Sequence, residues 1–177
     1  MKKYKIAITG PESTGKTTLA QQLAVYFNTI WVPEFARSYI ETLARPYHYD
    51  DILLIAKEQM KKEDEAFANH DVIFLDTELL VTKIWCEYKY GQCHSWILDE
   101  IKRRKYDLVL LCNIDLPWTY DPQREHPHKR QELWTLYKSQ AYTFYHPVEI
   151  VSGQGNERFD QAILAIRKWL PELFKIK

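Results

Sequence analysis

One run of eight residues constrains this chain more than any other feature, because it couples a backbone geometry to a ligand. Residues 10–17 read G-P-E-S-T-G-K-T and fit the pattern G-x-x-x-x-G-K-[ST] of a phosphate-binding P-loop. Residues 4–9 before it form a short apolar strand pattern, and residues 17–27 after it have helical apolar spacing. Strand, glycine loop and helix in this order are the context that a P-loop requires. The alternative, an exposed lysine in a glycine-rich turn, does not explain these flanking patterns.

The loop also predicts how a polyphosphate is held. Glycines allow successive backbone N–H groups to turn inward, and the start of the following helix adds partial positive charge. Lys16 is expected to bridge the β- and γ-phosphates, and Thr17 to offer its hydroxyl to Mg²⁺. The nucleotide-binding residues predicted from this run are Gly10, Glu12, Ser13, Thr14, Gly15, Lys16, Thr17 and Thr18.

Length, charge and cysteine usage limit what this chain can be. Its 177 residues suit a single α/β domain over 1–177. Lysine plus arginine and aspartate plus glutamate both total 24, and this balance argues against nucleic acid or an anionic membrane as the main partner. No apolar run approaches the ~20 residues of a membrane span, and the first residues lack the apolar region of a signal peptide. The three cysteines form no C-x-x-C pair, so we expect a cytoplasmic protein with reduced thiols.

Strand and helix patterns alternate along the chain. Short apolar runs predict five buried strands, at 5–9, 29–33, 71–76, 106–112 and 148–151. Helical spacing is found between and after them, at 15–27, 35–43, 50–68, 79–88, 96–105, 129–145 and 156–170. Asp50 and Asp51 are expected to cap the third helix. The alternation predicts a three-layer P-loop NTPase fold with a five-stranded parallel sheet, helices on both faces and ligands at the carboxyl ends of the strands.

Asp76 closes the predicted strand of residues 71–76. An apolar strand that ends in aspartate is the usual second half of a P-loop nucleotide site, where the carboxylate holds Mg²⁺ directly or through water. The alternative is that Asp76 caps the helix that starts near Glu78. With the P-loop present, we predict that Thr17 and Asp76 are the metal ligands.

Glu34 ends the second predicted strand, and Arg37 follows one helical turn later. A kinase needs a carboxylate near the acceptor hydroxyl to orient it and to take its proton, and this strand end faces the γ-phosphate from the acceptor side. Two alternatives remain open: Glu34 caps the next helix, or it pairs with Arg37 on the surface.

Residues 113–130 join the fourth strand to the next helix and are rich in proline and charge. We predict that this segment is a lid whose Arg124 and Arg130 clamp the transferring phosphate and exclude water. A solvated loop is the alternative. The loop at 152–155 follows the last strand and could wrap the nucleotide base, with Arg158 packing on it, or could simply be a glycine turn.

Together these motifs resemble the ribosylnicotinamide kinase domain of NadR-type proteins. The matching pieces stand in family order and span nearly the whole chain, at 10–19, 32–37, 74–78, 115–124 and 151–158. The glutamate within the P-loop, the run P-E-F-A-R and the run P-W-x-x-D-x-x-R make the match much more specific than a P-loop alone. One departure is D-P-Q-R at 121–124, where the family usually has D-G-x-R.

The resemblance implies ATP- and Mg²⁺-dependent phosphorylation of nicotinamide riboside to nicotinamide mononucleotide. NadR proteins also carry an adenylyltransferase domain, so we expect this chain to supply only the riboside step. A flat cationic ring suits an aromatic wall through stacking and cation–π attraction. Candidates for this wall are Trp85, Tyr88, Trp118 and Tyr39, and the predicted catalytic residues are Lys16, Glu34, Asp76 and Arg124.

Two other readings stay open at this point. A nucleotide-dependent regulatory switch that reads guanine usually has an Asn-Lys-x-Asp stretch after a strand, whereas residues 113–115 read N-I-D. A kinase for nucleotides or other metabolites would need arginines for the acceptor's own phosphate, which a glutamate at position 34 disfavours. The oligomeric state is left undetermined.

Overall fold

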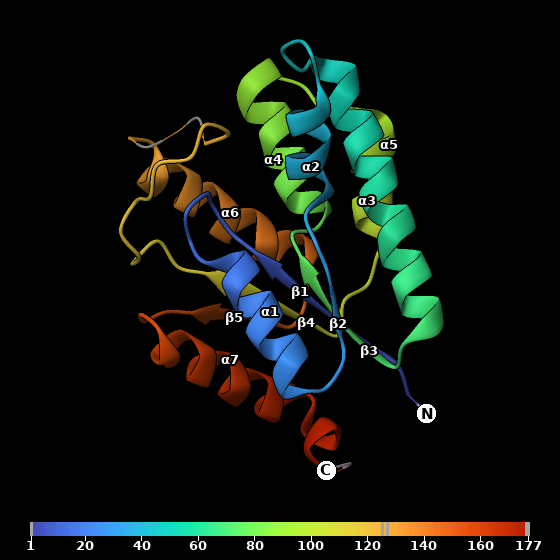
Figure 1. The fold of residues 1–177 in the computed structure, drawn as a ribbon, viewed down its shortest axis with the longest axis vertical. Coiled ribbons are helices and arrows are strands. Elements are labelled where there is room, and N and C mark those ends of the chain that lie inside the picture. The colour runs from blue at the N-terminus through green and yellow to red at the C-terminus, as the bar shows by residue number, and fades with distance from the viewer. Residues whose placement is uncertain (1, 125, 127, 176–177) are drawn as a thin grey trace.

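The strand patterns of the sequence assemble into one parallel sheet. The computed structural model describes residues 2–124, 126 and 128–175. Within them, a five-stranded sheet has the order β2-β3-β1-β4-β5, with all pairs parallel (Figure 1). The strands are β1 (Tyr4–Thr9), β2 (Ile30–Val32), β3 (Val72–Asp76), β4 (Leu108–Cys112) and β5 (Val148–Val151).

Helices cover both faces of this sheet, which confirms the predicted three-layer P-loop fold (Figure 1). One face packs against α1 and α7 and the other against α3, α4, α5 and α6. The helices are α1 (Lys16–Tyr26), α2 (Phe35–Thr42), α3 (Tyr49–Asn69), α4 (Leu79–Tyr90), α5 (Ser95–Arg103), α6 (Arg130–Phe144) and α7 (Asn156–Trp169), followed by the 3₁₀ turn η1 (Pro171–Phe174). Within the described residues, every helix is too short or too polar to cross a bilayer.

The alternation of side chains along β4 explains why both faces must be covered. Leu108 and Leu110 pack toward α1 and α7, whereas Val109 and Leu111 pack toward the opposite helices. All four side chains are fully buried. A strand that is apolar on both sides is stable only between two helical layers. The central strands therefore place the P-loop, which follows β1, at the middle of the carboxyl edge.

The start of α3 confirms part of one prediction. The N-cap residue is His48, and Asp51 caps the helix from its first turn as the acidic partner in a capping box, whereas Asp50 is not part of that box. Asp51 lies in the first turn and accepts a 2.6 Å hydrogen bond from the His48 backbone N–H. Its carboxylate also accepts hydrogen bonds from Arg45, at 2.6 and 2.9 Å, and one from the Tyr39 hydroxyl at 2.8 Å. Asp51 thus binds α2 and the following loop to α3.

Candidate active site

The P-loop has the backbone that its glycines predict. Gly10 has a φ of +136°, and a Cβ there would lie 2.8 Å from the Cys112 carbonyl oxygen. Gly15, with a φ of +76°, precedes the first residue of α1. The Thr14 hydroxyl and the Lys16 ammonium both donate to the Pro11 carbonyl oxygen, each at 2.8 Å. The loop therefore curls around its own lysine at the positive end of α1, which is an anion-binding geometry.

Thr17 and Asp76 form one corner of the site. The Thr17 hydroxyl donates to Asp76 Oδ2 at 2.6 Å, while Asp76 Oδ1 is buried without a hydrogen-bond partner in the described part of the chain. Burial raises the pKa of Asp76, against the opposing effects of the Thr17 hydrogen bond and the Lys16 charge. Hard oxygen donors and an unsatisfied carboxylate oxygen fit Mg²⁺, which takes few protein ligands and completes its shell with phosphates and water.

The alternative role of Asp76, capping α4, is performed by another residue. Glu78 is the N-cap of α4, and its carboxylate accepts a 2.6 Å hydrogen bond from the Leu80 N–H. The same carboxylate accepts a 2.8 Å hydrogen bond from Thr9, the residue before the P-loop. Asp76 therefore faces the P-loop, and Glu78 anchors the helix behind it.

Glu34 lies at the start of α2, but it neither caps this helix with its side chain nor forms the predicted ion pair with Arg37. Its side chain makes no capping hydrogen bond to α2. Arg37 pairs instead with Asp121 of the predicted lid, at 2.8 Å. Glu34 lines a cavity next to the P-loop, and burial raises the pKa of its carboxyl although Lys16 opposes the shift. A half-buried carboxylate with a raised pKa is a stronger base than an ordinary glutamate, which suits a proton acceptor.

The two lid arginines converge on the P-loop. Arg124 Nη1 lies 3.4 Å from the Ser13 hydroxyl, and Arg130 Nη2 donates to the Ser13 carbonyl oxygen at 3.3 Å. The Trp118 ring lies near both, its centre 6.0 Å from the guanidinium carbon of Arg124 and 5.9 Å from that of Arg130. Arg130 Nε is buried without a partner in the described residues. The tertiary structure therefore brings both cations over the phosphate-binding loop.

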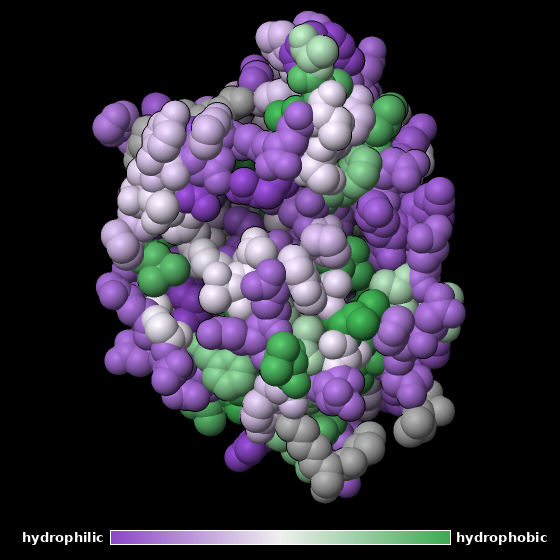
Figure 2. All heavy atoms as spheres, viewed as in Figure 1, coloured by the Kyte–Doolittle hydropathy of each residue, from purple (hydrophilic) through white to green (hydrophobic). Residues whose placement is uncertain are grey.

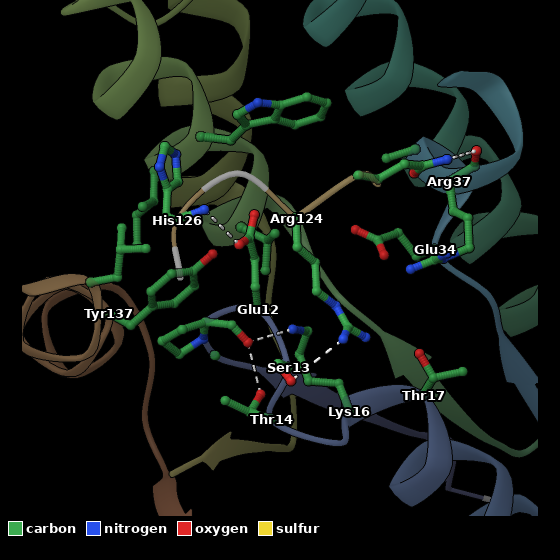
Figure 3. Close-up of a pocket in the computed structure, with 18 of the residues that line it drawn as sticks. Glu12, Ser13, Thr14, Lys16, Thr17, Glu34, Arg37, Arg124, His126 and Tyr137 are labelled. Atoms are coloured by element: carbon green, nitrogen blue, oxygen red, sulfur yellow. Dashed lines mark hydrogen bonds between the residues drawn. The ribbon is translucent and has the colours of Figure 1, made fainter. Parts of the chain in front are cut away.

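The cavity beside the P-loop has a volume of about 320 Å³. Its opening lies in the hollow that hydrophilic residues surround in Figure 2. One end is the P-loop itself, and the other is lined by carboxylates and aromatic side chains (Figure 3). The carboxylate and aromatic residues that line the cavity are Glu12, Glu34, Tyr47, Trp85, Tyr88, His126 and Tyr137. The P-loop end suits a polyanion, and the aromatic side chains offer faces on which a flat molecule can stack.

The aromatic wall differs in part from its prediction. Trp85 and Tyr88 line the cavity, whereas Trp118 lies near both lid arginines and Tyr39 bonds to Asp51. Tyr47, Tyr137 and His126 also line the cavity and are not among the predicted residues. Tyr137 follows Leu133 at helical spacing on the buried face of α6, which was a usable signal. Tyr47 and His126 lie in loops, where no periodicity marks them.

Arg158 is buried beneath the neighbouring loops. Its guanidinium donates to the carbonyl oxygens of Gly153, Val151 and Asn113, at 3.1, 3.2 and 3.3 Å, and pairs with Asp115. These contacts hold the loop after β5 against the loop after β4. The predicted packing of Arg158 on a nucleotide base remains a prediction.

Comparison with known proteins places these features in a family. The AAA domain family AAA_28 matches residues 5–158. The trifunctional NAD biosynthesis/regulator protein NadR of Salmonella typhimurium is 32% identical over 125 residues, which are 67% of this chain and 30% of that protein. A crystal structure of a NadR protein in complex with NR has a TM-score of 0.80 at 25% identity, covering 96% of this chain and 52% of that one. Another, with NAD and AMP-PNP, has a TM-score of 0.78 at 22% identity, covering 94% and 49%.

Proposed function

Because this chain belongs to the AAA domain family and is a NadR-like P-loop kinase domain, we propose that it phosphorylates nicotinamide riboside with ATP and Mg²⁺, forming nicotinamide mononucleotide. At a coarser level, it is a phosphotransferase of the nucleoside or nucleotide kinase type that uses ATP. The chain spans about a third to a half of the length of these relatives, so their other activities are not carried over.

One observation carries the proposal: a single cavity joins the P-loop cations to a carboxylate at the acceptor end. Lys16 and Arg124 line one side of this cavity and Glu34 lines the other (Figure 3). Transfer of a phosphoryl group needs positive charge on the donor oxygens and a base at the attacking hydroxyl. The cavity supplies both within one partly enclosed volume.

In the reaction that we propose, an acceptor hydroxyl oxygen forms a bond to the γ-phosphorus while the bond from that phosphorus to the bridging oxygen of ADP breaks. Glu34 takes the hydroxyl proton. Lys16, Arg124 and Arg130 stabilise the charge that develops on the phosphoryl oxygens. Thr17 and Asp76 would hold Mg²⁺, which neutralises charge on the β- and γ-phosphates when bound.

The charges at the acceptor end favour a nucleoside over a nucleotide acceptor. Glu12 and Glu34 both line this end, and a second phosphate group would be repelled by them. Arg37 also lines it, but its guanidinium pairs with Asp121. The guanine-reading alternative is disfavoured as well, since Asp115 accepts from the Gly153 N–H at 2.6 Å and pairs with Arg158.

A coupled ADP-release assay over a panel of acceptors tests this function. Nicotinamide riboside should give turnover, whereas nicotinamide mononucleotide should not. Lys16→Ala should abolish the rate in a protein that still folds, because within the described residues the Lys16 ammonium bonds to Pro11 of its own loop. The proposal would be contradicted if the monophosphate gave turnover and the riboside did not. It would also be contradicted if none of the acceptors in the panel gave turnover.

A further inference from the structure

One P-loop side chain, Glu12, contacts the lid and lines the cavity. Glu12 projects from the loop toward His126 and the aromatic end of the cavity (Figure 3). Its Oε2 lies 3.3 Å from the His126 backbone nitrogen, which donates to it from the lid. By contrast, Thr14 and Lys16 bond back to Pro11 within the loop. Glu12 therefore belongs to the acceptor end of the cavity.

The charge of Glu12 reaches the other groups at this end. Together with burial and Asp76, it raises the pKa of Glu34. Burial and the charges of Glu78, Glu34 and Glu12 also raise the pKa of Tyr137 well above its usual range. The carboxylates of Glu12 and Glu34 thus concentrate negative charge at the acceptor end. This end is partly enclosed, so Coulomb interactions there are stronger than in water.

Flat walls border the same space. The Trp85 indole N–H donates to the Tyr47 hydroxyl at 2.9 Å, and the two rings meet edge to face at 4.9 Å. The Tyr88 hydroxyl donates to Glu132 at 3.0 Å. Because these rings are held by their own polar atoms, their faces keep a defined position against a planar ligand.

We propose that Glu12 is a specificity-determining residue, which selects an acceptor whose planar ring carries a positive charge. This inference rests on the proposed function and adds to it the group that recognises the ring's charge. A carboxylate about 6 Å from a cation, at an effective dielectric near 20, favours it over a neutral isostere by at least tenfold. Cation–π attraction to the aromatic wall also favours a charged ring, but it does not depend on the Glu12 charge.

Two ribosides separate charge from shape. Nicotinamide riboside carries a permanent pyridinium charge, and its 1,4-dihydro form has the same substituents and no ring charge. Glu12→Gln removes the carboxylate charge and keeps an oxygen that can accept from the His126 N–H. Glu65→Gln, an exposed position near the end of α3, is the matched control for the change in net charge.

We would measure Kd by calorimetry with a non-hydrolysable ATP analogue present, and kcat/KM with ATP, for both ribosides. In the wild type and in Glu65→Gln, both measures should favour the charged riboside over its dihydro form at least tenfold. In Glu12→Gln this ratio should fall at least fivefold. The KM for ATP should change less than twofold. An unchanged preference in Glu12→Gln, or an equal loss for both ribosides, would overturn the inference and leave Glu12 as a lid contact. If neither riboside is turned over but Glu12→Gln still lowers the binding preference for the charged riboside, the proposed function is refuted and the inference is retained.

Discussion

The hydroxyl of Thr17 donates a 2.6 Å hydrogen bond to Oδ2 of Asp76, which joins the start of α1 to the end of β3. The second oxygen of the same carboxylate is buried and has no partner among the described residues. A buried carboxylate oxygen without a partner is costly in a folded protein. We therefore propose that Thr17 and Asp76 form half of a cation site, and this proposal leads to the first prediction.

Asp76→Asn should raise the Mg²⁺ concentration needed for half-maximal rate at least tenfold and lower kcat about a hundredfold, because the amide keeps an acceptor for Thr17 but loses the charge. Initial rates over a Mg²⁺ series measure both quantities. Asp71→Asn, exposed just before the other end of β3, is the control and should change neither. An unaltered Mg²⁺ dependence in Asp76→Asn would remove Asp76 from the metal site.

Arg124→Ala should lower kcat by about 10²–10³, because the guanidinium stabilises charge that develops on the transferred group. Arg124→Lys should recover only part of this rate, since an ammonium keeps the charge but not the planar fork. The measurement is kcat at saturating ATP and acceptor, with Arg103→Ala on the exposed surface of α5 as control. A kcat within twofold of wild type would show that Arg124 only braces the loop.

The rate should fall on the acid side at a higher pH than an ordinary glutamate would impose. Burial raises the pKa of Glu34, and the proposed base works only when deprotonated, so activity is lost as pH falls through this raised pKa. Glu34→Gln should remove the acid limb of the kcat/KM profile and lower the rate by about 10²–10⁴. If the kcat/KM profile of Glu34→Gln keeps the same acid limb, that limb belongs to another titrating group.

Asp51→Asn should lower the free energy of unfolding by about 1 kcal/mol at pH 7, the usual contribution of a capping carboxylate. The hydrogen bonds from Arg45 and His48 hold the pKa of Asp51 well below its usual range. A carboxyl whose folded pKa is lowered stabilises the protein above its unfolded pKa of about 3.9, and this contribution is lost as pH falls below that value. Urea unfolding should therefore show a difference in the free energy of unfolding between wild type and variant that is smaller at pH 3 than at pH 7. An equal difference at both pH values would refute the role of the Asp51 charge.

Much of the donor site could be predicted from local sequence. Lys16 and Thr17 are located by the glycine pattern, and Asp76 and Glu34 by their positions at the ends of apolar strands. Parallel strands bring their carboxyl ends to one edge, so residues distant in sequence are expected to meet there. That reasoning needs only strand order and direction, which buried apolar runs reveal.

The acceptor end could be predicted only in part. Trp85 and Tyr88 are two of the four predicted aromatic residues, but Tyr47 and Tyr137 are not among them. The predicted Trp118 lies near the lid arginines instead. Aromatic side chains are common in cores, and sequence spacing does not distinguish a ring that faces a cavity from one that packs.

The sequence by itself determined the order of strands and helices, the phosphate-binding loop and the carboxylates at the sheet edge, because these depend on local periodicity and on the rules of parallel sheets. Only the tertiary structure decided which partner each charged side chain takes. Arg37 pairs with Asp121, 84 residues away, and this leaves Glu34 to the cavity. Such choices depend on how closely helices and loops pack in space, since a hydrogen bond forms only within about 3 Å, and no local pattern encodes that distance.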